Sequence, residues 1–67
     1  MSVKYFILKK EQSLRGYREG YTCFSYCNIT EDVKVRVDES LLRYILCFTH
    51  NNQCFNCVCD RFEIKED

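Results

Sequence analysis

The segment Val33-Lys34-Val35-Arg36-Val37 alternates strictly between apolar and charged residues and is the clearest structural signal in the chain. Successive side chains of a β-strand point to opposite faces, so the three valines share one face and the two cations the other. The pattern predicts a strand with one face in the core and the other in water.

The residues that follow this strand decide the fold class, because two structures fit them. Asp38 can accept hydrogen bonds from the open backbone N–H groups at the start of a helix. Apolar residues then recur at spacings of three to four, as on one face of a helix. They are Leu41, Leu42, Ile45 and Phe48. This interpretation, which we favour, predicts a short helix over about residues 39–49.

The alternative for the same residues is a second strand. Leu42–His50 then forms a strand, the chain turns at Asn51-Asn52, and Gln53–Ile64 returns beside it as a hairpin. The residues that this hairpin places opposite each other are Arg43 with Asp60 and Phe48 with Phe55.

Three other segments carry residues typical of strands. The apolar run Val3–Leu8 contains one charge, Lys4, and predicts a central strand. The polar stretch Glu11–Glu19 predicts a turn that leads into a second strand, Tyr21–Cys27, as an antiparallel hairpin. Residues 54–64 predict a last strand. With the helix, this gives an α+β fold, a small antiparallel sheet of about four strands with one short helix on it.

The length and charge of the chain limit its functions. The 67 residues, with no proline and two glycines, predict a single small domain over residues 1–67. Ten basic and ten acidic residues cancel, so the chain lacks the positive field that nucleic-acid binders use. No apolar run approaches the length of a membrane span or of a signal-peptide core. We therefore expect a cytoplasmic protein with no membrane partner.

The cysteines are the most unusual feature of the composition. Cys54 and Cys57 have the spacing of a zinc knuckle, and Cys23 with Cys27 would complete a four-thiolate site. A second possible ligand set combines three thiols with the single histidine: Cys47, His50, Cys54 and Cys57. One zinc ion is the only cofactor that these spacings predict. Buried reduced thiols and disulfides are the open alternatives.

The aromatic content points to a protein partner. The ten Phe and Tyr side chains exceed what so small a core can hide, and exposed tyrosines are enriched at protein interfaces. We predict that Tyr17, Tyr21 and Tyr26 bind the partner. So small a core can hardly enclose a catalytic pocket, so we predict a non-catalytic protein-binding module: an inhibitor, an antitoxin-like regulator or an adaptor. An uncovered sheet edge could also pair two copies as a homo-oligomer.

A zinc-stabilised nucleic-acid-binding module is the alternative function. Four cations lie near the first predicted hairpin: Lys9, Lys10, Arg15 and Arg18. In this alternative, these side chains contact phosphates and nearby tyrosines stack on bases.

Overall fold

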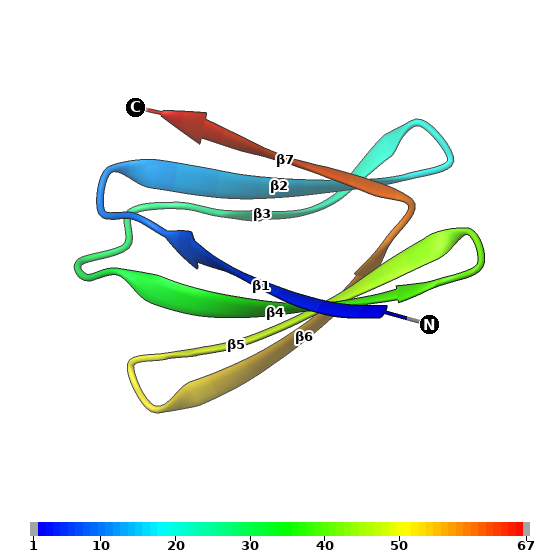
Figure 1. Ribbon diagram of the computed structural model, residues 1–67. Coiled ribbons are helices and arrows are strands. Elements are labelled where there is room, and N and C mark those ends of the chain that lie inside the picture. The colour runs from blue at the N-terminus through cyan, green and yellow to red at the C-terminus, as the bar shows by residue number, and fades with distance from the viewer. Residues whose placement is uncertain (1, 67) are drawn as a thin grey trace.

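The computed structural model describes residues 2–66, and this part of the chain is all-β, with seven strands in two antiparallel sheets (Figure 1). The strands are β1 (Ser2–Leu8), β2 (Gln12–Arg18), β3 (Tyr21–Tyr26), β4 (Val33–Ser40), β5 (Arg43–His50), β6 (Gln53–Cys59) and β7 (Arg61–Glu66). The four-stranded sheet has the order β1-β4-β5-β6, and the three-stranded sheet has the order β3-β2-β7. The predicted α+β fold is therefore wrong.

The two sheets are joined where β6 leads into β7. Asp60 alone separates these strands, and the chain turns there from the larger sheet to the smaller one (Figure 1). The backbone N–H of Asp60 donates to the carbonyl oxygen of Tyr17 at 2.8 Å, which fixes this corner against the end of β2. The single predicted strand over residues 54–64 is thus two strands in two sheets.

The helix predicted over residues 39–49 is replaced by the β4–β5 hairpin. Asp38 does not cap a helix but lies within β4, opposite Val3 on one side and Ile45 on the other. Leu46 and Phe48 are buried while Leu41 and Leu42 are exposed, so the burial of β5 has the period of a strand. A helix of this length gains little stability by itself, whereas β5 pairs along both edges.

The strand alternative for this segment is the one that the structure contains. Phe48 lies opposite Phe55, and the chain turns at Asn51-Asn52, both as that alternative predicted. The pairing of β5 with β6 ends at Tyr44, so Arg43 pairs with Ser40 of β4 rather than with Asp60.

The first predicted hairpin is also wrong. β1 pairs with β4 at the edge of its sheet, not with β3, and is not a central strand. The stretch predicted as a turn, Glu11–Glu19, contains β2, the middle strand of the smaller sheet. Its inward-facing positions are Leu14 and Gly16, and its polar residues face outward, so few apolar residues mark it as a strand.

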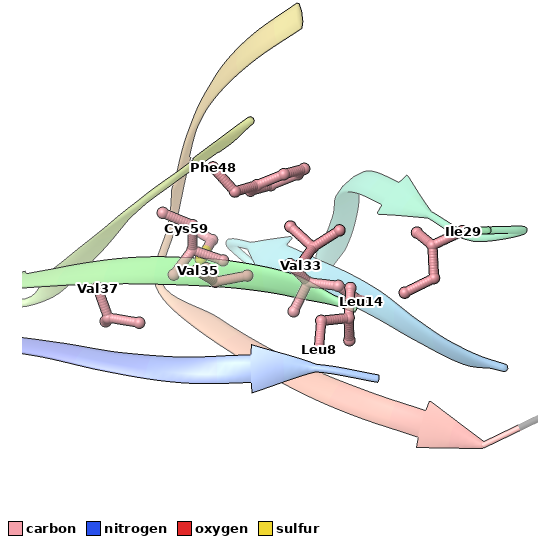
Figure 2. Packing of buried hydrophobic residues seen from close by; sticks show 9 residues of the cluster. Leu8, Leu14, Ile29, Val33, Val35, Val37, Phe48 and Cys59 are labelled. Atoms are coloured by element: carbon pink, nitrogen blue, oxygen red, sulfur yellow. The ribbon is translucent and has the colours of Figure 1, made fainter. Parts of the chain in front are cut away.

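The core lies between the two sheets, where the labelled side chains of Figure 2 point toward one another. The predicted alternation of residues 33–37 is confirmed, since the valines are buried and Lys34 and Arg36 are exposed. The buried cluster consists of Leu8, Leu14, Ile29, Val33, Val35, Val37, Leu46, Phe48 and Cys59. Partly buried rings from both sheets pack around it, among them Phe6, Phe24, Tyr26, Tyr44, Phe55 and Phe62. Most rings therefore serve the core.

Gly16 provides the first testable prediction. A Cβ atom at this position would overlap the ring of Phe24, which lies opposite Gly16 on the neighbouring strand β3. We expect Gly16→Ala to lower the free energy of unfolding by about 1–3 kcal/mol, because the ring must leave its packed position. Urea unfolding measures this. Ser25→Ala, at an exposed site on β3, is the control and should change stability by less than about 0.5 kcal/mol. Equal effects would contradict the proposed close packing.

Candidate functional site

Within residues 2–66, three hairpins turn through two residues. Two of these turns contain the Asn or Gly residues that a positive φ angle favours. The β2–β3 turn is Glu19-Gly20, with φ angles of 51° and 85°. The β5–β6 turn is Asn51-Asn52, with φ angles of 53° and 63°. Positive φ at both central residues is the type I′ geometry, in which Asn and Gly are preferred. Gly20, Asn51 and Asn52 therefore suit the geometry of their turns, whereas Glu19 does not.

The third turn, between β4 and β5, is Leu41-Leu42, and local sequence does not explain it. Leu41 has a φ of 25°, and Leu42 has no positive φ. A positive φ at the first central residue alone is the type II′ geometry, which favours glycine at that place. A bulky side chain there is an outlier that costs on the order of 1–3 kcal/mol. The fold carries a strained leucine at this tip.

Both leucines of this turn are also in water. Leu41 is 102% exposed and Leu42 86% exposed, the highest values among the exposed large apolar residues of the described chain. Isolated exposed apolar residues are common on protein surfaces. Leu41 and Leu42 combine two unfavourable features, a strained turn and exposed apolar side chains. Neither leucine contributes to the packing of the core.

A third exposed apolar residue lies at the same end of the molecule. Tyr21 follows the β2–β3 turn and is 77% exposed. The backbone N–H of Glu19 in that turn donates to the Asp60 carboxylate at 3.0 Å, and Asp60 also lines the depression below the leucines. Figure 1 shows the β2–β3 and β4–β5 turns at the same end. We call Tyr21, Leu41 and Leu42 the apolar tip.

The surface beside the apolar tip is hollowed. The depression at the base of the Leu41-Leu42 turn is lined also by Glu39, Arg43, Tyr44 and Asp60. A larger cleft of about 420 Å³ shares Glu39 and Tyr44 with it. Its rings are packed on one another: the centroids of Phe6 and Phe62 are 5.8 Å apart, and those of Tyr44 and Phe62 are 5.3 Å apart. Lys4 and Arg61 are the cations on its wall.

The other two tyrosines predicted to bind a partner already have partners within the chain. The Tyr17 hydroxyl donates to Glu63 at 2.5 Å, and the Arg61 guanidinium lies 4.3 Å from the centroid of the Tyr17 ring. The hydrogen bond from Tyr17 is the main cause that lowers the pKa of the Glu63 carboxyl. Tyr26 is hydrogen-bonded to Nδ1 of His50, and burial raises the pKa of its hydroxyl.

The structure brings predicted zinc ligands close in two pairs, Cys47 with Cys54 and Cys23 with Cys57, but does not assemble either set of four. Cys54 and Cys57 are three positions apart on β6, so their side chains point to opposite faces of the strand. The same holds for Cys47 and His50 on β5, whose predicted proximity depended on a helix. Within residues 2–66, no group of three or more His, Cys, Asp or Glu side chains is arranged to hold a metal ion. All six cysteines are free thiols, and zinc stays a prediction.

Three of the thiols have raised pKa values, which lowers their reactivity. Burial raises the pKa of Cys59 to about 11, and the neighbouring Cys23, Cys57 and Asp60 add to the effect. Burial likewise raises the pKa of Cys57 and of Cys47. Because the thiolate is the nucleophile, these side chains resemble core residues rather than reactive groups.

The four cations of the nucleic-acid alternative are spread along β2 from one end to the other and do not form one cluster. Lys9 and Lys10 precede β2, and Arg18 is its last residue. A strand rises about 3.3 Å per residue, so the seven residues of β2 separate them by roughly 20 Å. The backbone N–H of Lys10 also donates to the Asp32 carboxylate, at 2.9 Å.

No protein-family model matches the chain, and no curated protein or solved structure matches it either. Within the described residues there is no helix with the length and hydropathy needed to cross a membrane. Sequence reasoning named Tyr21 but missed Leu41 and Leu42, because it assigned the two leucines to one face of a helix.

Thiol labelling tests the assignment of the cysteines. In the folded protein at neutral pH, we expect iodoacetamide to modify the exposed Cys23, Cys27 and Cys54 first, and Cys59 only on unfolding. A pKa near 11 leaves Cys59 a thiolate fraction about a hundredfold below that of an ordinary thiol. Peptide mass spectrometry identifies the modified sites. Joint protection of Cys23, Cys27, Cys54 and Cys57 that a chelator removes would contradict this and support zinc.

The strain at the apolar tip can be measured through stability. We expect the double variant Leu41→Gly/Leu42→Asn to raise the melting temperature, because a type II′ turn favours glycine at its first central position. Relief of about 1 kcal/mol corresponds to a rise of roughly 4–8 °C in a domain of this size. Ser25→Ala, at an exposed site on β3 outside the turns, is the control and should not raise the melting temperature. A double variant that melts at or below the wild-type temperature would show that the leucines are not strained.

Proposed function

We propose that this protein is a small non-catalytic protein-binding module, an inhibitor, antitoxin-like regulator or adaptor, that acts in the cytoplasm and inserts its apolar tip into a pocket of a partner protein. The observation that carries the proposal is the Leu41-Leu42 turn, which is strained and fully exposed. Backbone strain is often retained where it serves binding. The six free thiols fit a reducing compartment.

The energetics of the apolar tip favour a protein pocket. Full burial of a leucine side chain stabilises a complex by about 1.5–3 kcal/mol relative to water, so two leucines supply a sizeable part of a specific affinity. The side chains around them carry both signs, with Glu39 and Asp60 beside Arg43. A mixed rim around an apolar centre is the usual anatomy of a protein interface. Phosphate backbones would instead require a cationic rim.

Site-specific photo-crosslinking tests the proposal. A photo-reactive leucine analogue is placed at position 42, and the protein is incubated with extract from the cells that express it. We expect one discrete protein to be cross-linked, and its cross-linking to fall in competition with unlabelled wild type but not with unlabelled Leu41→Gly/Leu42→Asn. The same analogue at position 52, on an exposed turn at the opposite end, is the matched control.

Two results would contradict the proposal. One is equal cross-linking from positions 42 and 52, which would mean that the apolar tip has no special affinity. The other is binding to single-stranded nucleic acid that falls steeply with salt and is lost when Lys9, Lys10, Arg15 and Arg18 are replaced. That second result would favour the nucleic-acid-binding alternative.

A further inference from the structure

Within residues 2–66, the edge strand β1 has one long side with no hydrogen-bonded neighbour. It pairs with β4 over its whole length, and the order β1-β4-β5-β6 places it at the end of the larger sheet. An open edge of this kind offers a row of backbone N–H and C=O groups to another strand.

The outer face of β1 is apolar as well as exposed. Val3, Tyr5 and Ile7 alternate along it and are 49%, 57% and 48% exposed. The ammonium group of Lys34 lies 4.6 Å from the centroid of the Tyr5 ring and holds this ring against β4. β1 thus combines one unpaired backbone edge with a row of exposed apolar side chains.

The other three sheet edges carry more protection against pairing than β1, in which Lys4 is the one charged residue. β7 is largely charged, with the sequence Arg-Phe-Glu-Ile-Lys-Glu. β3 contains a bulge at Cys23, because Gly16 pairs with Phe24 and Tyr17 with Thr22. At the edge of β6, the Cys23 thiol already donates to the carbonyl oxygen of Val58, at 3.5 Å. Charges, bulges and covering contacts are the usual protections of an edge.

The sequence of β1 is complementary to itself. In an antiparallel pair of two copies centred on Tyr5, the middle residue of Ser2–Leu8, Val3 lies opposite Ile7 of the second copy and the two Tyr5 rings lie opposite each other. Lys4 then lies opposite Phe6 of the second copy, so the two Lys4 side chains are diagonal neighbours and not directly opposite each other. Aromatic and β-branched cross-strand pairs of this kind stabilise a sheet.

We propose that this face binds a second copy of the same chain, with the two β1 strands pairing antiparallel about Tyr5 and joining two four-stranded sheets into one. The self-complementary register is what favours a second copy over a strand of an unrelated protein. The apolar tip contains no residue of β1, so this inference and the proposed function can fail separately.

A charge-swap experiment tests both the interface and its register. Sedimentation velocity of the wild type between about 1 µM and 1 mM, where small interfaces dissociate, is expected to show a monomer–dimer equilibrium. Tyr5→Lys and Tyr5→Glu should each raise the dissociation constant about tenfold, because the ring pair is lost and like charges face each other. An equimolar mixture of the two variants should form dimers with one chain of each, which native mass spectrometry distinguishes by mass.

The control is Thr49→Lys, an exposed substitution in β5, which is an inner strand of the same sheet. It should leave the dissociation constant unchanged, and thermal melting should show that all three variants are folded. A wild type that stays monomeric up to about 1 mM overturns the proposal. So does a dimer that the Tyr5 substitutions do not weaken, or mixed variants that fail to pair, since either would place the contact elsewhere or in another register.

Discussion

β4 hydrogen-bonds to β1 along one edge and to β5 along the other, and its valine face fills the middle of the core. The burial of Val33, Val35 and Val37 orients the whole larger sheet, because a shift of one residue in register would turn these side chains into water. The smaller sheet then covers this face, with Leu14 and the rings of Phe24, Tyr26 and Phe62.

The join between the sheets positions the candidate site. Asp60 separates β6 from β7, its backbone N–H bonds to Tyr17, and its carboxylate accepts from the N–H of Glu19. One residue therefore connects the corner, the end of β2 and the β2–β3 turn. Its side chain also lines the depression beneath Leu41 and Leu42. The neighbourhood of the apolar tip is assembled from parts of the chain that lie far apart in sequence.

Part of the fold could be predicted from the sequence. The alternation of residues 33–37 identified β4, because one face is buried and the other is charged. The next segment was ambiguous, since Leu41, Leu42, Ile45 and Phe48 also fit a helical spacing, while the inward positions of β5 include the polar His50. β2 was hidden because its inward side holds only Leu14 and Gly16. The zinc hypothesis that used Cys47 and His50 assumed that residues three apart share a face, which is true of a helix and false of a strand. The exposure of two leucines depends on where a hairpin turns, which local composition did not reveal.

The Asp60 contact also bears on how the protein would meet a partner. Both turns at this end connect hydrogen-bonded strands, and Glu19 of the β2–β3 turn also donates to the Asp60 carboxylate. The apolar tip is therefore ordered before it binds. A preformed surface loses little conformational entropy on association. The net charge is zero, so there is no long-range attraction to speed the encounter. Discrimination between partners would then reside in the lifetime of the complex rather than in its rate of formation.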